Sequence, residues 1–396
     1  MNSTVDKLKL SVVVLFIMAT GIWFGSPLLT RGQGQMMSMT RVGALPWRSN
    51  KPFTEAGYVG NRACAECHAK EFETYHHTAM ARALQMPIDS DVLRARQRLT
   101  FRIGPYRYEI VRRGEESIYT VSDGNKSISV PIRYSFGQGK AGQTYLLQYN
   151  GAFYESRVSY YREIDGLDFT IGYQRTVPAS LEDALGRAVS MDEARSCFGC
   201  HATAAVAGRS LQLEHLMPGV GCEACHGPGR DHILAAEAGR FNDLQIFNPK
   251  KLSADALTQE FCGSCHRSAE DVLSLPQQGG INNVRFQPYR IFTSRGHDPN
   301  DPRLSCTACH NPHEHLQQEA AFYDAKCTVC HRSMASLRSP ALARTEIEQG
   351  RTAKACPVKA QDCVSCHMPR VELPGAHFRF TDHRIRVARE GEPFPR

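Results

Sequence analysis

Cysteine is missing from two long parts of this 396-residue sequence, although the chain contains 15 cysteines in all. None precedes Cys64, which excludes the N-terminal lipid-modified cysteine of a lipoprotein. None lies between Cys67 and Cys197, which sets that interval apart from the rest of the chain. Lysine is also scarce, so the formal net charge of +7 is carried by arginine.

The cysteines that are present follow one pattern. Fourteen of them form Cys-x-x-Cys pairs, and each of these seven pairs is followed at once by histidine. A disulfide framework gives no reason for the histidine, and zinc ribbons need two Cys-x-x-Cys knuckles per site, which an odd number of pairs does not supply. Cys-x-x-Cys-His is instead the attachment motif of haem c, because two cysteines one helical turn apart form thioethers to two vinyl groups and the histidine becomes the proximal iron ligand.

We therefore predict seven covalently attached haem c groups. The predicted thioether cysteines are Cys64, Cys67, Cys197, Cys200, Cys222, Cys225, Cys262, Cys265, Cys306, Cys309, Cys327, Cys330, Cys363 and Cys366. The predicted proximal ligands are His68, His201, His226, His266, His310, His331 and His367. The fifteenth cysteine, Cys356, has no partner for an internal disulfide; a passive thiol is favoured over a cross-linking, axial or redox role.

Nine histidines lie outside the motifs and could fill the sixth coordination positions. His76 and His77 are near neighbours, as are His313 and His315, and we expect each of these two groups to supply one ligand. The predicted distal ligands are then His77, His215, His232, His297, His313, His377 and His383. Two imidazoles generally leave a haem at lower potential than a histidine and a methionine, so mostly bis-histidine, low-potential haems are expected.

The arginine surplus fits the same prediction. Arginine's planar fork pairs with a carboxylate through two hydrogen bonds, so it suits the propionates of haem. The positive charge is therefore not interpreted as a nucleic-acid site, and we expect no nucleic-acid partner.

The N-terminal part predicts export. Two lysines precede an uncharged, mainly apolar run over residues 10–29, long enough to span a bilayer with the N-terminus left inside. Residues 1–30 are expected to be a retained anchor helix, with a cleaved signal peptide as the alternative. Either outcome places the remainder in the periplasm or on the extracytoplasmic face of the inner membrane.

The rest of the chain divides by composition. Residues 31–56 predict a flexible linker, and residues 57–90 a first haem segment. Residues 91–180 predict a β-rich insert, because β-branched and aromatic runs are separated by turn signals such as Asn150-Gly151. Residues 181–396 predict a six-haem domain. The expected fold class is a multihaem cytochrome c, mainly short α-helices and loops packed around haems, with the β-rich domain inserted.

Several segments resemble a broad family of bacterial multihaem cytochromes. The family includes the tetrahaem cytochrome of ammonia oxidisers, pentahaem nitrite reductase, octahaem hydroxylamine oxidoreductase and octahaem tetrathionate reductase. The segments that carry the resemblance are Tyr58–His68, Tyr75–Met80, Gly221–Gly229, Cys306–His313, Cys363–Pro369 and Thr381–His383. The resemblance implies closely packed haem pairs and distal ligands at His77, His232, His313 and His383.

The departures from that family bear on function. Pentahaem nitrite reductases usually carry lysine in place of one motif histidine, whereas all seven motifs here end in histidine. Nothing in the sequence identifies the cross-linked tyrosine that hydroxylamine oxidoreductase needs. The favoured function is electron transfer in an extracytoplasmic respiratory chain, with a quinol-oxidising membrane complex or other cytochromes as partners. The alternatives are a haem-based oxidoreductase acting on nitrite, hydroxylamine or tetrathionate at one open haem, with His76 or His315 in its active site, and a filament-forming cytochrome.

Overall fold

The structure is a computed structural model that describes residues 47–275, 280–329, 331, 361–389 and 391–395. The chain divides into two compact units, Met1–Gln35 and Met36–Arg396, and every described residue belongs to the second. The predicted anchor over residues 10–29, most of the predicted linker, Cys330 and Cys356 lie outside the described residues. Among the described helices, none has the length and apolar character needed to cross a bilayer.

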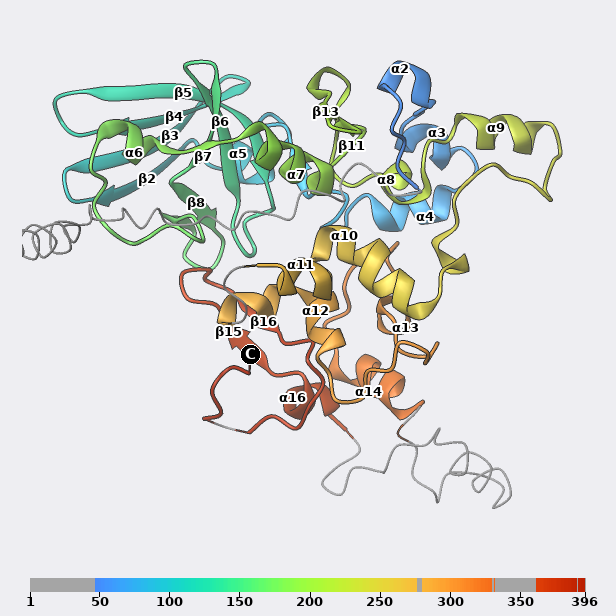
Figure 1. Ribbon diagram of the computed structural model, residues 1–396. Helices are drawn as coiled ribbons and strands as arrows, with labels where there is room; N and C mark the ends of the chain where they lie inside the picture. The colour runs from blue at the N-terminus through green and yellow to red at the C-terminus, as the bar shows by residue number, and fades with distance from the viewer. Residues whose placement is uncertain (1–46, 276–279, 330, 332–360, 390, 396) are drawn as a thin grey trace, which may run out of the picture. The chain divides into compact units, whose positions relative to one another are not determined.

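An antiparallel sheet of eight strands occupies the predicted β-rich region (Figure 1). Its strands run in the order β10-β7-β6-β5-β4-β3-β2, and β1 pairs with the end of β5. The strands are β1 (Leu84–Gln85), β2 (Arg98–Ile103), β3 (Tyr106–Arg113), β4 (Glu116–Ser122), β5 (Ser127–Phe136), β6 (Thr144–Tyr149), β7 (Ala152–Ser156) and β10 (Gly186–Val189). The predicted turn at Asn150-Gly151 is confirmed: both residues have positive φ, 48° and 77°, and they join β6 to β7.

One face of this sheet forms the largest apolar core among the described residues. Alternate residues of β3 and β4 point into it, as their buried-then-exposed pattern shows. A second hairpin, β8 (Val158–Tyr161) with β9 (Gly166–Phe169), adds Val158, Tyr160 and Leu167 to the same core. The tyrosines of this region serve mainly as packing, since Tyr145 and Tyr160 are fully buried.

The sheet extends past the boundaries that composition suggested. Strand β1 lies inside the predicted first haem segment, and β10 lies inside the predicted six-haem domain. A second apolar cluster joins Leu84 of β1 and Tyr134 of β5 to Phe198. Because Phe198 belongs to the helix that carries the second motif, the sheet and this motif share one core rather than forming separate domains.

The remaining described chain is short helices, brief hairpins and loops. The helices are α2 (Phe53–Ala56), α3 (Asn61–Ala65), α4 (Ala69–Tyr75), α5 (Asp91–Ala95), α6 (Leu181–Leu185), α7 (Met191–His201), α8 (Cys222–His226), α9 (Arg230–Glu237), α10 (Gly263–His266), α11 (Ala269–Leu273), α12 (Gln287–Phe292), α13 (Cys306–Cys309), α14 (Ala320–Thr328) and α16 (Cys363–His367). The 3-10 turns are η1 (Leu213–His215), η2 (Pro249–Lys251) and η4 (Ile281–Arg285), and η3 (Ala256–Cys262) is a π-helix. The short strands are β11 (Ala202–Thr203), β12 (Val206–Ala207), β13 (Ser210–Leu211), β14 (Met217–Pro218), β15 (Arg370–Glu372) and β16 (Arg379–Thr381).

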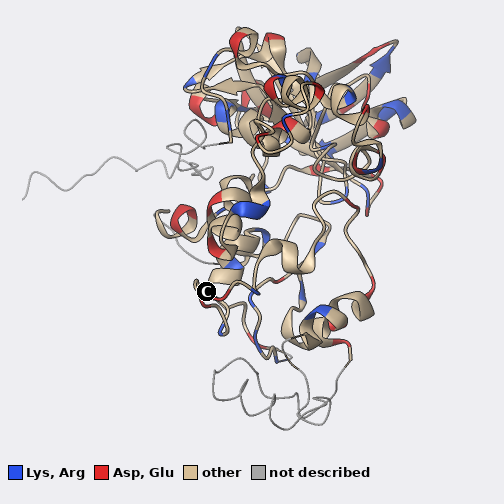
Figure 2. Cartoon of the chain, turned by 90° about the vertical axis from the view of Figure 1, so that its right-hand side faces the viewer, with Lys and Arg blue, Asp and Glu red and all other residues tan. Residues whose placement is uncertain are grey.

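Side-chain hydroxyls start several of these helices. Ser190 caps α7 by accepting from the backbone N–H of Glu193, and Ser268 forms a reciprocal capping box with Asp271 at α11. The positions of basic and acidic residues are interspersed along the described elements (Figure 2).

Candidate haem-attachment sites

Each of the six predicted motifs that the structure describes completely lies on or beside one helical turn. A backbone bond closes the turn across the motif: the N–H of His68 donates to Cys64 O at 2.9 Å, and the N–H of His310 donates to Cys306 O at 2.9 Å. Such a turn places residues three apart on the same side of the helix. The two thiols of a motif can therefore reach one planar ligand, with the following histidine beside it.

Thiols from different motifs lie within hydrogen-bonding reach of one another. The contacting pairs are Cys64 with Cys222, Cys200 with Cys265, Cys262 with Cys306, and Cys327 with Cys363. These contacts join the first motif to the third, the second to the fourth, the fourth to the fifth, and the sixth to the seventh. Attachment sites that are far apart in sequence are thus neighbours in space.

Three motif histidines face a histidine from outside the motifs. The ring centroids are 6.2 Å apart for His68 and His232, 6.0 Å for His226 and His313, and 6.2 Å for His310 and His383. Metal–imidazole nitrogen bonds are about 2 Å long, so two imidazoles on opposite sides of one iron have centroids roughly 6 Å apart. The spacing of all three pairs fits an iron between the rings.

Backbone carbonyls fix the tautomer of several of these rings. The Nδ1 atoms of His226, His232 and His383 lie 3.0, 2.8 and 3.0 Å from the carbonyl oxygens of residues 247, 244 and 381. A carbonyl only accepts, so Nδ1 carries the proton and Nε2 keeps the lone pair that a metal needs. The motif histidines His201 and His367 make the same kind of bond, at 3.1 and 3.0 Å.

Burial keeps four of the motif and facing imidazoles neutral. It lowers the pKa of His383 to about 4, and it also lowers the pKa of His201, His226 and His310. A neutral ring is the form that ligates a metal.

The other four predicted distal ligands have different surroundings. His77 lies against His76, with ring centroids 3.6 Å apart, and His215 stacks on Phe53 at 4.6 Å. His297 Nε2 lies 3.5 Å from an oxygen of Asp255. His377 Nε2 lies 2.7 Å from Asp168 Oδ2, which leaves Nδ1 as its free nitrogen. The structure brings none of these four rings against a motif histidine among the described residues, and their ligand role stays a prediction.

The end of the predicted flexible linker is folded against the motifs. Trp47 is buried between Phe247 and Phe261, with ring centroids 5.4 and 4.7 Å away. The neighbouring Arg48 donates to Gly199 O at 2.6 Å and contacts Cys265 Sγ at 3.4 Å. The linker prediction therefore does not hold at Trp47 and Arg48. The overall composition of residues 31–56 is typical of a linker, but the segment contains Trp47, one of only two tryptophans in the chain. A tryptophan is a signal that the residue could pack in a core.

A buried carboxylate inside the third motif ties it to the first. Glu223 is 2% exposed, and its two oxygens accept the backbone N–H groups of Val59, Gly60 and Gly229 at 2.9, 2.8 and 2.8 Å. Asn61 Oδ1 accepts from the N–H of Cys222 at 2.9 Å. Sequence reasoning missed this link, because nothing in the motif marks the residue after the first cysteine as buried.

Two arginines beside the fourth motif have a chemistry that suits an anion. The guanidinium carbons of Arg267 and Arg285 lie 5.9 and 5.8 Å from the ring centroid of Phe286. The buried Arg285 Nε makes no hydrogen bond with any described residue. Burial, and then the nearby positive charge of Arg267, lower the pKa of Arg285. Because an unpaired buried cation is costly, this site fits a carboxylate such as a haem propionate.

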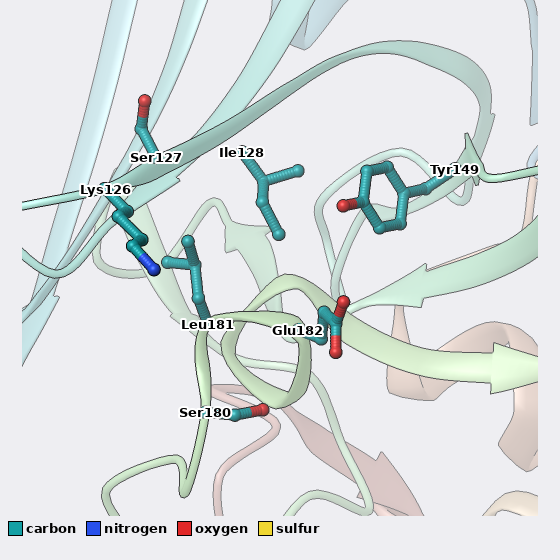
Figure 3. A pocket seen from close by; sticks show the side chains of 7 residues that line it. All are labelled: Lys126, Ser127, Ile128, Tyr149, Ser180, Leu181 and Glu182. Atoms are coloured by element: carbon teal, nitrogen blue, oxygen red, sulfur yellow. The ribbon is translucent and has the colours of Figure 1, made fainter.

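One pocket in the sheet region stands apart from these residues. It has a volume of about 520 Å³ and lies where β5, β6 and α6 approach one another (Figure 3). Its lining residues are Lys126, Ser127, Ile128, Tyr149, Ser180, Leu181 and Glu182. It includes no cysteine or histidine, so it has no part in the candidate site.

Paired thiols, facing imidazoles and the buried Arg285 Nε without a partner among the described residues together define the site of a covalent haem protein of the c type. Residues 173–227 match the family described as cytochrome c554 and c-prime. That segment is well under half of the chain, and it contains two complete motifs, ending at His201 and His226. The match supports covalently bound haem c and haem-based electron transfer.

The chain is also similar to the crystal structure of outer cell wall cytochrome OcwA. The similarity covers 83% of this chain and 80% of that chain, at 15% sequence identity and a TM-score of 0.36. A search of curated proteins found no match.

Proposed function

We propose that this chain is a seven-haem c-type cytochrome that transfers electrons in an extracytoplasmic respiratory chain. The observation that carries the proposal is the set of three facing histidine pairs, each spaced for one iron. Both axial positions of those irons would be taken by nitrogen. A haem closed in this way exchanges electrons rather than binding a substrate.

The chain's own residues would prepare these sites. Haem c supplies a one-electron ferric–ferrous couple when it is bound. The cysteines would hold the cofactor covalently, and the carbonyls that accept from Nδ1 leave Nε2 free to bind a metal. Burial lowers the pKa of His226 and His383, which keeps these two imidazoles neutral.

Contacts between motifs support transfer along the chain. Cofactors attached through Cys64 and Cys222, or through Cys262 and Cys306, would be neighbours, because these thiols are within hydrogen-bonding reach. With the contacts of Cys200 with Cys265 and of Cys327 with Cys363, the thiols form three neighbouring groups: the first and third motifs, the second, fourth and fifth motifs, and the sixth and seventh motifs. The protein would accept electrons from a quinol-oxidising membrane complex or another cytochrome, while residues 10–29 anchor it on the periplasmic side of the inner membrane.

Spectroscopy of the full-length, haem-loaded protein tests the proposal. Intact mass should show seven haems, one for each motif. Low-temperature EPR of the oxidised protein should be dominated by low-spin ferric signals. The near-infrared absorption spectrum of the same protein should lack a strong methionine-to-iron band. Fewer than seven haems would refute the count, and a methionine band would refute the bis-histidine assignment.

One observation favours a second candidate function at the fourth motif. The unpaired Arg285 and its neighbour Arg267 could hold a small oxyanion beside the haem attached at Cys262 and Cys265. Under this alternative the chain would be an oxidoreductase acting on an oxyanion such as nitrite or tetrathionate at one open haem. A high-spin ferric signal of one haem, together with turnover of one of these compounds, would support this second candidate over pure electron transfer.

A further inference from the structure

The deepest ion pair of the described chain joins two segments that are 92 residues apart in sequence. Arg290 Nε donates to Asp382 Oδ1 at 2.8 Å, and Arg290 Nη2 donates to Asp382 Oδ2 at 2.9 Å. Both side chains are 0% exposed. This is the two-pronged geometry in which an arginine and a carboxylate fit best.

A buried ion pair is poor evidence of a gain in stability. Removing two charges from water costs about as much as their attraction returns, and apolar replacements are often as stable. What such a pair does supply is a fixed position for the backbone on either side of it. Arg290 lies in α12, and Asp382 follows β16 immediately.

The residue next to Asp382 is His383, the ring that faces His310 at 6.2 Å. Further bonds link the same two segments: Ser294 Oγ lies 3.3 Å from His383 O and accepts from the N–H of Ile385 at 2.8 Å. Arg290 is held in turn from its other side, where Nη1 donates to Pro395 O at 3.0 Å and its guanidinium lies 4.5 Å from the Phe394 ring centroid.

We propose that Arg290 and Asp382 form a positioning pair, which holds His383 as the sixth ligand of the haem attached at Cys306 and Cys309. The inference rests on the proposed function, because it takes His383 to be an iron ligand. It adds the residues that keep this ligand in place, and neither of them touches the iron.

The segment 382–388, which we call the strap, also contacts a second motif. His367 Nδ1 donates to Arg386 O at 3.0 Å, and the N–H of Ala388 donates to Cys366 O at 2.9 Å. Loosening the strap should therefore affect the haem attached at Cys363 and Cys366 as well. The sites around His232 and His313 should stay unchanged, since neither contacts the strap.

The test compares four variants of the full-length, haem-loaded protein. Asp382→Asn removes the negative charge but keeps the size of the side chain. Arg290→Lys keeps the positive charge but removes the planar guanidinium that makes two parallel hydrogen bonds to Asp382. His383→Ala is the reference for an open haem. Asp183→Asn is the control, because Asp183 pairs with the buried Arg157 at 3.0 Å in the sheet region, and neither residue hydrogen-bonds to a described motif histidine.

Cyanide binding to the oxidised protein and low-temperature EPR supply the readouts. Loss of a partner that orients a metal ligand typically costs 10–100-fold in affinity. We expect Asp382→Asn to speed cyanide binding at the haem attached at Cys306 and Cys309 by about tenfold or more and to give a partial high-spin signal, with a smaller change at the haem attached at Cys363 and Cys366. Arg290→Lys should have a smaller effect in the same direction, and Asp183→Asn should match the unmodified protein.

The outcomes separate this inference from the proposed function. If His383→Ala opens a haem while Asp382→Asn and Arg290→Lys leave the spectra unchanged, the positioning pair is refuted and the proposed ligand stands. If His383→Ala opens no haem, the ligand assignment itself fails. If Asp382→Asn does not mature, Ser294→Ala removes only the hydroxyl that bridges the two segments. A Ser294→Ala protein with unmodified cyanide kinetics would then count against the inference.

Discussion

At the scale of single residues, the paired histidines show how one chain prepares a metal ligand. Each of His226 and His232 has one nitrogen committed to a carbonyl and the other left free, and each faces a second imidazole. Burial lowers the pKa of His226, which keeps that ring unprotonated at neutral pH. The identity of the ligand should then set the potential of the haem.

Replacing His313 by methionine tests that assignment. A thioether ligand raises haem potential relative to a second imidazole. We expect His313→Met to raise the midpoint potential of one haem by on the order of 0.1 V, a fraction of the roughly 0.8 V that axial ligands span. Spectroelectrochemical titration of the full-length protein would measure the shift, and the near-infrared methionine band should appear with it. The control is His315→Met, because His315 is exposed two residues away; an equal shift in both variants would contradict the assignment.

A second prediction at this scale concerns Glu223. In Glu223→Gln an amide nitrogen replaces one oxygen, so at least one of three backbone N–H groups loses its acceptor. A hydrogen bond to a charged group contributes about 1.5–3 kcal/mol, and we expect a destabilisation of that order. Thermal unfolding followed by circular dichroism would measure it. Glu237→Gln, at an exposed position of α9, is the control; the same melting temperature in both variants would show that the buried contacts contribute little.

At this scale, site residues that are close together in the sequence could be predicted, whereas pairs of residues far apart in the sequence could not. The third motif could be recognised as a haem-attachment site from the sequence alone. Thioether attachment needs Cys222, Cys225 and His226 on one helical turn, so all three are close together in the sequence. The partner of His226 is His313, from another part of the chain, and no local pattern specifies that pairing. The position of Asp382 against Arg290 is equally invisible in sequence, because it depends on how α12 meets the end of β16.

At the scale of elements, short segments near the predicted boundaries proved the hardest to assign. Strand β1 has two residues and β10 has four, too few for an alternating pattern to show. Both short strands form because the longer strands β5 and β7 have backbone groups free to pair with them. The longer hairpins were predictable, since Asn150-Gly151 encodes a tight turn between two aromatic runs.

The segment around Trp47 gives a prediction at the element scale. Its indole packs on Phe247 and Phe261 and positions Arg48 beside Cys265. We expect Trp47→Ala to destabilise the protein by about 3–5 kcal/mol, the usual cost of truncating a buried tryptophan. Thermal unfolding of the haem-loaded protein would measure the loss. The matched control is Phe241→Ala, since Phe241 is 73% exposed; if both variants melt alike, residues 47–56 behave as the linker that the composition suggested.

At the scale of the whole described molecule, apolar burial is very uneven. The sheet region holds a large cluster of buried side chains that includes Tyr108, Tyr119 and Leu147. Among the described residues beyond 300, the buried hydrophobic side chains are only Leu373 and Ala376. A segment with so little buried apolar surface cannot offset the entropy of ordering its chain. The described part beyond residue 300 therefore depends on its cofactors for a core.

This asymmetry predicts how the chain behaves without haem. In protein produced without haem attachment, amides of β3, β4 and β6 should remain protected from hydrogen exchange, because their core is made by the chain itself. Amides of α13, α14 and α16 should exchange at rates close to those of an unfolded chain. Hydrogen-exchange mass spectrometry of the haem-free and haem-loaded proteins makes the comparison, with the sheet peptides as an internal control. Equal protection of α13, α14 and α16 in both forms would contradict the prediction. It would mean that the polypeptide folds this region without help from the cofactors, which would then contribute little to its stability.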